Sequence, residues 1–440
     1  MTRQKCKIGR AERNSCGSKV VRANLSHHPA SEGVLPRRNW FKESTAQPKF
    51  HSQPHERFMQ LPYTIVAFSH LRWNFVYQRP QHLLSRLAAL HPVVFVEEPE
   101  FDADGPARWE RSSPHQNVRV YRPRTPVQAP GFHRDQLPVL EPLLAELSAD
   151  LGDSDVLAWL YTPMALPLAL SLDPDAAVYD CMDELSLFAG APPELLGLEE
   201  QLLEYADVMF TGGPSLYRAK QSRHPNVHCF SSSVDADHFR LRDDVGNEVS
   251  EAEDQAELPH PRLGFYGVID ERLDLDIVRR VAEAHPEWQI VLVGPVVKID
   301  PVQLPRMPNI HYFGQRSYEE LPRYLAGWDV CLLPFARNDA TRFISPTKTL
   351  EYMAAELPIV STPITDVAEP YGHIVYLGGT SEEFITACEE AMSSSPEERV
   401  GRAAQMRQVL AGTSWDVTVT AMHKLLTEAM AGRTPLQVPA

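Results

Sequence analysis

Short apolar runs alternate along this chain with longer segments in which apolar residues recur every three or four positions. The run at 64–69 is mainly apolar, and the segment 80–90 that follows it places Leu83, Leu84 and Leu87 at helical spacing. Such a run is typical of a strand covered on both faces, and helical spacing is typical of the helix that covers it. The pattern continues with strands at 93–96, 156–160, 177–179 and 208–210 and a helix at 193–205. This alternation predicts an α/β fold with a mostly parallel, doubly wound sheet.

A polar, acidic segment at 241–258 interrupts the alternation, which then starts again. New apolar runs occur at 263–266, 289–293, 310–313, 330–333 and 359–361, and a helical pattern covers 415–430. Two doubly wound domains in series predict a ligand cleft between them. The predicted organisation is a tail at 1–58, a Rossmann-like domain at 59–240, an acidic linker at 241–258, a second Rossmann-like domain at 259–414, and a closing helix and tail at 415–440.

Charge separates the first 58 residues from the rest of the chain. They hold 12 Lys and Arg against 4 Asp and Glu, which leaves 30 basic and 54 acidic residues elsewhere, so the two parts carry +8 and −24. The tail lacks periodic apolar positions, which predicts disorder. It is either an upstream artefact, with Met59 as the true start, or a basic tail that touches acidic lipid. The acidic body excludes nucleic acid as a partner.

Cysteine usage and hydropathy point to a cytoplasmic protein. The six cysteines are scattered without close pairs, which favours reduced thiols over a disulfide framework. No apolar run approaches the roughly 18 residues that span a bilayer, and the chain opens without an apolar leader segment. If the tail contacts lipid, we expect that contact to be peripheral, at the inner face of the membrane.

The segment that begins at Ser345 has the features of a helix start that faces an anion. Ser345 is a favoured N-cap residue, and Pro346 suits the first helical position. Free N–H groups and the helix dipole then favour a phosphate group, and Lys348 adds a positive charge. Glu351 follows one turn later and can accept hydrogen bonds from sugar hydroxyls. The alternative interpretation is an ordinary capped surface helix.

Three motifs carry a family resemblance. They are Leu-Glu-Tyr-Met-Ala-Ala at 350–355 with Leu-Pro-Ile-Val-Ser at 357–361, Tyr-Asp-Cys-Met-Asp-Glu at 179–184, and Gln-Arg-Pro-Gln-His-Leu-Leu at 78–84. These motifs resemble those of a bacterial subgroup of the retaining group 1 glycosyltransferases, whose superfamily includes glycogen synthase. The resemblance covers about residues 60–430 and implies the GT-B fold, in which two Rossmann-like domains face a central cleft and a C-terminal helix crosses back. It also implies a nucleotide sugar as co-substrate, with no further cofactor.

The resemblance assigns donor-binding positions to the second domain. Glu351 would hold the ribose hydroxyls, and Arg272 would bring a positive charge to the diphosphate, although Val268 stands where the family has its usual arginine. Gln315 and Arg316 fall where the family reads the base. Phe343 replaces the glutamate that contacts the donor sugar, and Asn338, Asp339, Thr341 and Arg342 are the nearby substitutes. The predicted donor-binding residues are Gly267, Gln315, Arg316, Ser345, Thr347, Thr349 and Glu351.

The first domain is predicted to hold the acceptor. Asp183 and Glu184 follow a strand at the edge where α/β proteins bind ligands, and a carboxylate there can orient or deprotonate a hydroxyl. Arg79 and His82 would meet an anionic acceptor, with helix-surface hydrogen bonding as the alternative. The family often places histidine before such an aspartate, where this chain has Met182. Asp183, Lys348 and Arg272 form the predicted catalytic set.

Neither a metal site nor a nucleotide-binding motif of another class is predicted. The chain lacks G-x-G-x-x-G, G-x-x-x-x-G-K-[ST] and G-x-S-x-G. The D-x-D pairs, which are frequent by chance in so acidic a chain, are Asp102/Asp104, Asp153/Asp155, Asp173/Asp175, Asp235/Asp237 and Asp274/Asp276. His51 and His55 have helical spacing but lie in the tail.

The predicted function is metal-independent, hexosyltransferase-like transfer of a sugar to the hydroxyl of a glycan or lipid-linked acceptor, in the synthesis of a cell-surface polysaccharide or glycolipid. The alternatives are a sugar-nucleotide epimerase on the same fold and a non-catalytic nucleotide-sugar binding module.

Overall fold

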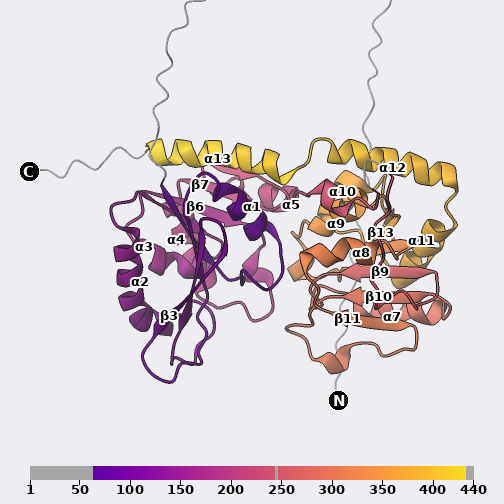
Figure 1. Cartoon of the computed structure of the whole chain (residues 1–440), viewed down its shortest axis with the longest axis horizontal. Coiled ribbons are helices and arrows are strands. Elements are labelled where there is room, and N and C mark those ends of the chain that lie inside the picture. Colours follow the sequence, from indigo (N-terminus) through magenta and orange to yellow (C-terminus); the bar gives the residue numbers. More distant parts are fainter. Residues whose placement is uncertain (1–62, 243–245, 433–440) are drawn as a thin grey trace, which may run out of the picture. The chain divides into compact units, whose positions relative to one another are not determined.

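The apolar runs form the strands of two separate, mainly parallel sheets (Figure 1). The structure is a computed structural model that describes residues 63–242 and 246–432. Contacts group Gln60–Ala440 into one compact unit, and the chain regions that carry the two sheets are called its first and second halves below. The boundaries proposed at 240 and 259 stay a prediction. The tail at 1–58, with His51 and His55, lies outside the described residues.

The first half contains a sheet with the strand order β3-β4-β2-β1-β5-β6-β7-β8. Its strands are β1 Thr64–Ser69, β2 Val93–Glu97, β3 Arg108–His115, β4 Val118–Arg124, β5 Val156–Leu160, β6 Ala176–Cys181, β7 Val208–Thr211 and β8 Val227–Cys229. All neighbours are parallel except the β3–β4 pair, an antiparallel hairpin that the apolar pattern did not predict. Its strand β3 is exposed along most of its length, so it has no apolar run.

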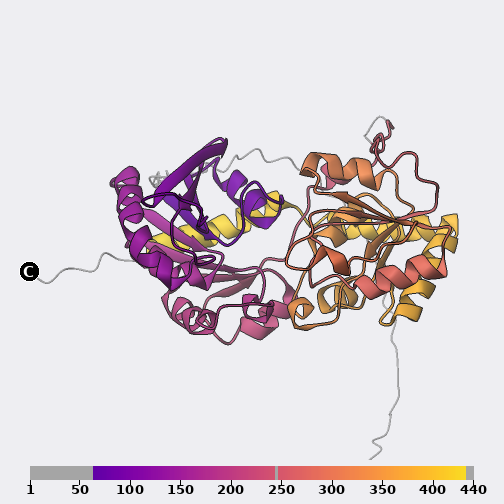
Figure 2. The same ribbon diagram turned by 90° about the horizontal axis from the view of Figure 1, so that it is seen from below.

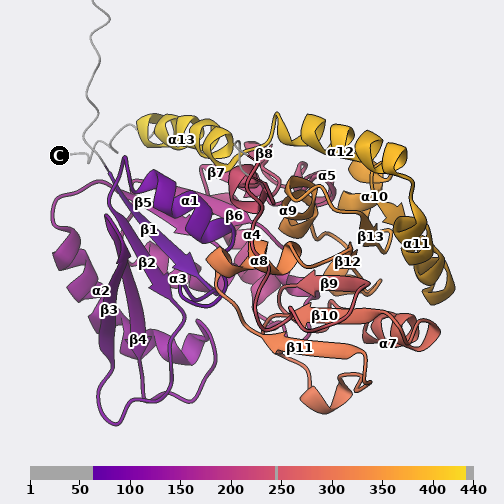
Figure 3. The same cartoon turned by 45° about the vertical axis from the view of Figure 1, so that its right-hand side comes forward.

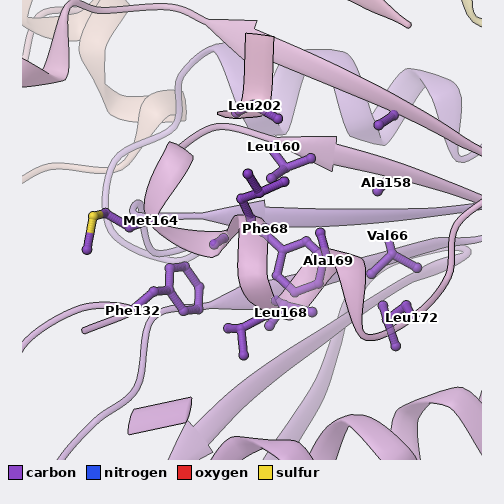
Figure 4. Packing of buried hydrophobic residues seen from close by; sticks show 14 of the residues in the cluster. Val66, Phe68, Phe132, Ala158, Leu160, Met164, Leu168, Ala169, Leu172 and Leu202 are labelled. Atoms are coloured by element: carbon purple, nitrogen blue, oxygen red, sulfur yellow. The ribbon is translucent and has the colours of Figure 1, made fainter. Parts of the chain in front are cut away.

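Helices cover both faces of the first sheet. They are α1 Arg79–Leu87, α2 Leu137–Leu151, α3 Leu166–Leu170, α4 Leu195–Tyr205 and α5 Pro214–Lys220. The next helix, α6 Ala236–Phe239, packs on the second half instead, with Phe239 in the hydrophobic cluster of that half. On one face, strand residues such as Val66, Phe68 and Leu160 pack against Leu168 of α3 and Leu202 of α4 (Figure 4). Burial of these side chains is the main force that holds the helices on the sheet. The α/β alternation predicted for this half is confirmed.

The second half contains a fully parallel sheet with the order β11-β10-β9-β12-β13-β14. Its strands are β9 Arg262–Tyr266, β10 Gln289–Val293, β11 Ile310–Gly314, β12 Val330–Leu333, β13 Ile359–Ser361 and β14 Tyr376–Leu377. Its helices are α7 Leu275–Ala284, α8 Leu321–Leu325, α9 Thr347–Ala354, α10 Thr365–Tyr371, α11 Ser381–Ser393 and α12 Pro396–Leu410. Every strand predicted for this half is present within one or two residues of its predicted ends.

The acidic segment before β9 packs onto the second half without forming a helix or strand over 249–258. Ala252 donates its backbone N–H to the carbonyl of Arg323 (3.0 Å), and Gln255 Nε2 donates to the carbonyl of Tyr324 (2.9 Å). The segment therefore contributes contacts to the second half in addition to connecting the sheets.

The last helix, α13 (Trp415–Gly432), crosses back from the second half to the first (Figures 1 and 2). Trp415, Val419, Met422 and Leu426 are buried in the cluster that also holds α1 and β1, and α13 lies beside α1 (Figure 3). The predicted crossover helix is thus confirmed. In the part of the chain that the structure describes, no helix combines the length and apolar character needed to cross a membrane.

Candidate active site

A pocket of about 180 Å³ lies where the carboxyl ends of the two sheets meet. The first half contributes the start of α1 and the segments after β6 and β7. The second half contributes the loop from β9 to α7, the ends of β10 and β11, and the start of α9. Ligands of open α/β sheets bind at this edge, because successive loops there diverge and leave a crevice. This pocket is therefore the candidate active site.

Helix α9 begins at the pocket, one residue later than predicted. Pro346 is the N-cap, with ψ of 118°, and Thr347 is the first helical residue. The Ser345 carbonyl accepts from Ser232 Oγ (3.2 Å), and Thr347 Oγ1 donates to that same hydroxyl (3.1 Å). These bonds hold the segment in an extended conformation against the first half, so the predicted Ser345 N-cap is wrong. Ser345, Pro346 and Thr347 all line the pocket, and the first N–H groups of α9 have no acceptor within the helix.

Lys348 lies on the pocket wall at this helix start. Its Nζ is 5.8 Å from the centre of the Phe265 ring, and no described residue forms a hydrogen bond or ion pair with it. Burial lowers the pKa of Lys348, an effect that Glu351 opposes and Arg272 reinforces. A partly desolvated ammonium without a fixed anionic partner is suited to receive an anionic ligand.

Gly267 gives the Lys348 side chain its space. Its φ is +137°, a conformation that L side chains rarely adopt, and a Cβ built there would lie 2.1 Å from Lys348 Cε. Gly294, with φ of +146°, lies against Gly267 and a Cβ there would lie 1.9 Å from the Gly267 carbonyl oxygen. Glycine is thus required at both positions for the β9 and β10 loops to approach each other and the lysine.

Glu351 faces the same pocket one turn after Lys348 and is 7% exposed. Its Oε2 accepts a hydrogen bond from Tyr266 OH (2.6 Å), whose backbone N–H in turn donates to Tyr352 OH (3.2 Å). Burial raises the pKa of Glu351, while Tyr266 and Lys348 favour its charged form. Only Tyr266 among the described residues donates to this carboxylate, so Oε1 keeps its capacity to accept a ligand hydroxyl.

Arg272 and Asp183 reach the pocket from opposite halves. Arg272 donates to Asp270 through both Nε and Nη2 (Nη2 to Oδ2, 2.7 Å), and Asp270 is buried. Burial raises the pKa of Asp183, whereas Arg272 and Arg79 favour its charged form. No described residue donates a hydrogen bond to the Asp183 carboxylate. Arg272 thus forms an ion pair with Asp270, whereas the Asp183 carboxylate has no hydrogen-bond donor among the described residues.

Gln315 and Arg316 line the pocket beyond the end of β11. Gln315 Nε2 donates to the carbonyl of Phe75 in the first half. Arg316 Nε donates to Tyr324 OH (2.6 Å), and its Nη2 donates to Asp254 (2.7 Å). Both side chains are therefore held by protein partners, and their predicted role in reading the base stays a prediction.

Four predicted site residues have positions that correct the sequence interpretation. Thr349 is 1% exposed and does not line the pocket, because it lies on the inner side of α9. Arg79 lines the pocket, but its Nη2 forms an ion pair with Asp180 Oδ1 at 2.8 Å. The guanidinium charge is therefore already neutralised within the protein and does not require an anionic acceptor. His82 is 1% exposed and stacks on Trp415 with ring centres 4.6 Å apart, away from the pocket. Glu184 forms an ion pair with Lys220 (2.6 Å) behind the pocket wall.

Phe343 and its polar neighbours also lie away from the pocket. Phe343 packs against the hydrophobic cluster of the first half, so it forms an apolar contact between the halves. Asn338 caps the short helix Asp339–Thr341, and its Nδ2 donates to the carbonyl of Glu271 (2.9 Å). Thr341 Oγ1 donates to the carbonyl of Ala336. These residues stabilise the loop, and none of them lines the pocket in place of the missing glutamate.

Sequence reasoning missed several residues that complete the pocket. Tyr266 orients Glu351, Asp270 orients Arg272, and Ser232 joins the α9 start to the first half. Tyr266 stands directly before the predicted turn at Gly267, and this position could have indicated that its side chain lies at the site. Ser232 lies in a segment without regular structure, so nothing in its neighbourhood singled it out.

Comparisons with known proteins agree with this geometry. Residues 261–394 match the family described as Glycosyl transferases group 1. The chain is 25% identical over 305 residues, 64% of its own length and 74% of the relative's, to TuaH of Bacillus subtilis (strain 168), a glycosyltransferase whose name assigns it provisionally to teichuronic acid biosynthesis.

Solved structures share the fold. A sucrose-phosphate synthase from Thermosynechococcus elongatus aligns with a TM-score of 0.64 and 16% identity, covering 84% of this chain and 100% of that one. The Anabaena protein HepE, in complex with UDP and glucose, aligns with a TM-score of 0.62 and 13% identity, covering 83% and 100%. The two sheets, the cleft and the crossover helix therefore define a GT-B protein. The predicted resemblance to the group 1 glycosyltransferases is confirmed: the family model over residues 261–394, the relative and the fold all support it.

Proposed function

We propose that this enzyme transfers a hexose from a nucleotide sugar to a hydroxyl group of a glycan or lipid-linked acceptor, with retention of anomeric configuration and without a metal ion. The position of Lys348 is the main support for this proposal. Its ammonium lies at the start of α9, on the pocket wall, and no anionic side chain of the described residues is bound to it. A diphosphate placed there would meet the ammonium and the free N–H groups of the helix start together.

The reaction develops negative charge as the donor leaves. The bond from the anomeric carbon to the diphosphate oxygen breaks, the bond from that carbon to the acceptor oxygen forms, and the hydroxyl proton passes to the diphosphate oxygen on the same face. Lys348, Arg272 and the first N–H groups of α9 would stabilise the departing diphosphate. Asp183 would orient the acceptor hydroxyl from the opposite wall, since its carboxylate has no donor in the described protein.

Relatives suggest the pathway. The TuaH name refers to the synthesis of a cell-wall polymer, and HepE was crystallised with UDP and glucose. We therefore place this enzyme in cell-surface polysaccharide or glycolipid synthesis, acting in the cytoplasm with peripheral access to a membrane acceptor. A mass-shift screen of nucleotide sugars against the purified protein would identify the donor. Product analysis would then distinguish transfer from epimerisation and from binding without turnover.

Transfer should persist in excess EDTA. In this proposal, Lys348, Arg272 and backbone N–H groups supply the positive charge that a metal ion would otherwise provide. Aspartates of the D-x-D pairs have other partners: Asp102 pairs with Arg124 (2.5 Å), Asp235 pairs with Arg86 (2.6 Å), and Asp274 caps α7. The measurement is the initial rate with and without chelator. Complete loss of activity that Mg²⁺ or Mn²⁺ restores would contradict the metal-free mechanism.

Glu351→Gln should mainly raise the donor KM. The substitution keeps the shape and one acceptor oxygen but removes the charge that strengthens hydrogen bonds to the ribose hydroxyls, so we expect a roughly tenfold rise with little change in kcat. Initial rates with varied donor provide the measurement. Glu356→Gln is the matched control, because Glu356 follows the same helix and pairs at the surface with Arg407 (2.7 Å). A large fall in kcat with unchanged KM would argue against ribose binding by Glu351.

A further inference from the structure

Helix α5 of the first half begins without a capping side chain of its own. Its N-cap is Gly213, and Pro214 occupies the first helical position, so the first free backbone donor of the helix is the N–H of Ser215. Serine, threonine, aspartate or asparagine at an N-cap would accept a hydrogen bond from such a group, but glycine has no side-chain oxygen. The start of α5 therefore needs an acceptor from elsewhere in the protein.

That acceptor is Asp366, which belongs to α10 in the second half. Its Oδ1 accepts a hydrogen bond from the backbone N–H of Ser215 (3.0 Å), and the two residues are only 4% and 6% exposed. Burial raises the pKa of Asp366, and hydrogen bonding from Ser215 opposes that rise. A helix of one half is thus capped by a buried carboxylate of the other half.

Gly213 allows the two halves to approach closely at this point. Its backbone is extended, with φ of −171°, so glycine is required here for space and not for conformation. A Cβ on Gly213 would lie 2.2 Å from Asp366 Oδ2 and 2.7 Å from Ser345 Cβ. Asp366 and Ser345, both from the second half, therefore lie against the same spot on the first half. A side chain at position 213 would push the halves apart.

This contact lies at the rim of the candidate active site. Gly212 and Ser345 both line the pocket, one from each half. A Cβ on Gly212 would lie 2.3 Å from the carbonyl oxygen of Met182, so the segment after β7 packs closely on the loop that carries Asp183. Ser345 leads directly into α9. The contact therefore joins the wall that carries Asp183 to the wall that carries Lys348.

We propose that Asp366 is a positioning residue for the glycosyl transfer proposed above: by capping α5 from the other half, it fixes the start of α9 opposite the loop that carries Asp183. This role rests on the proposed function. Lys348, Glu351 and Gly267 would hold the donor from the second half alone, whereas transfer needs both walls in register. Loss of the cap should therefore lower turnover far more than donor binding.

The first test needs no substrate. Amide hydrogen exchange is measured by mass spectrometry on peptides that cover 213–220 and 345–350, in the wild type and in Asp366→Ala. We expect exchange roughly threefold faster or more in both segments, and unchanged exchange in the buried strands β1 and β9. Faster exchange in 213–220 alone would show that Asp366 only caps α5. That result, equally faster exchange in the strands, or no change in either segment would overturn the proposal.

The second test measures turnover per binding site. The donor is the one found in the nucleotide-sugar screen, and titration calorimetry with its nucleoside diphosphate gives both the affinity and the concentration of competent sites. Turnover is followed as release of nucleoside diphosphate in the presence of p-nitrophenyl hexosides. For Asp366→Ala we expect kcat per site to fall about tenfold or more, with the affinity within about twofold of the wild type.

The conservative variant tests the role of the hydrogen bond. Asp366→Asn keeps an oxygen that can accept from the Ser215 N–H, so it should recover most of kcat and of the exchange protection. A loss equal to that of Asp366→Ala would contradict a role through this bond. Because kcat is expressed per competent site, a lower folded fraction alone cannot produce the expected fall.

Two further variants examine the same contact from either side. Gly213→Ala introduces the Cβ that would overlap Asp366 and Ser345, so it should reproduce the pattern of Asp366→Ala from the first half. Glu369→Gln is the matched control. Glu369 lies on α10 and pairs with Arg218 of α5 (2.8 Å), but this ion pair is exposed, so its loss should change neither exchange nor kcat.

Failure of this proposal and failure of the proposed function look different. If the wild type turns over a nucleotide sugar and Asp366→Ala keeps its kcat per site, the positioning role is wrong and the proposed function stands. If the wild type turns over no nucleotide sugar, the proposed function is wrong and the positioning role falls with it. The exchange experiment then still shows whether Asp366 joins the two halves.

Discussion

Lys348→Met is expected to lower kcat/KM for the donor by roughly tenfold to a hundredfold or more, with a loss in kcat as well as in donor affinity. A hydrogen bond to a charged group contributes about 1.5–3 kcal/mol, and this one would strengthen as the diphosphate leaves. An interaction that grows in the transition state affects kcat, whereas one that is equal in both states affects only KM. Initial rates with varied donor, on a protein whose folding is checked by circular dichroism, provide the measurement.

Lys348→Arg provides the control on geometry. A Cβ at Gly267 would nearly overlap Lys348 Cε, so the loop fits closely around an unbranched stem, and the planar guanidinium should not fully restore activity. If Lys348→Met stays within about twofold of the wild type in kcat/KM, the start of α9 is not the diphosphate site. The phosphate assignment would then fall, while the fold and family would stand.

The fold was predictable because its signal is local. Strands such as β1 and β10 are continuous apolar runs, and each of them is buried along its whole length. Strand β3 is the opposite case: it lies at the edge of the sheet, pairs only with β4 and is mostly exposed, so hydrophobic periodicity does not reveal it. The sequence thus predicts the strands that form the core better than those at the edge.

The candidate site was predictable only where it lies on one contiguous segment. Lys348 and Glu351 share a helix start with Pro346, and all three line the pocket. The helix began later than expected because Ser232, from the other half, holds the preceding residues extended. Gln315 and Phe75 also come from different halves, and the sequence has no pattern that brings them together. Helix capping preference is a local property, whereas these contacts depend on how the two sheets pack.

Lys220→Met is expected to destabilise the folded protein by about 3–5 kcal/mol, the typical cost of breaking a buried ion pair. Lys220 is 2% exposed, and its Nζ donates to Glu199 Oε1 (2.6 Å) and forms an ion pair with Glu184 Oε2 (2.6 Å). Without the ammonium, two carboxylates would face each other, and Glu199 would retain Tyr179 OH (3.0 Å) and Arg223 (2.9 Å). The measurement is the midpoint of urea unfolding multiplied by its slope, compared with wild type.

Arg218→Met is the matched control, because Arg218 lies on the same helix and its ion pair with Glu369 (2.8 Å) is exposed, so removal should cost less than about 1 kcal/mol. Adding Glu199→Gln to Lys220→Met should recover part of the loss, because it removes one of the two carboxylate charges that would otherwise face each other. Glu184 directly follows Asp183, so the same lysine also holds the loop that presents Asp183 to the pocket. Transfer should therefore fall in Lys220→Met even at temperatures where the protein stays folded. Equal free energies of unfolding for Lys220→Met and Arg218→Met would contradict this account.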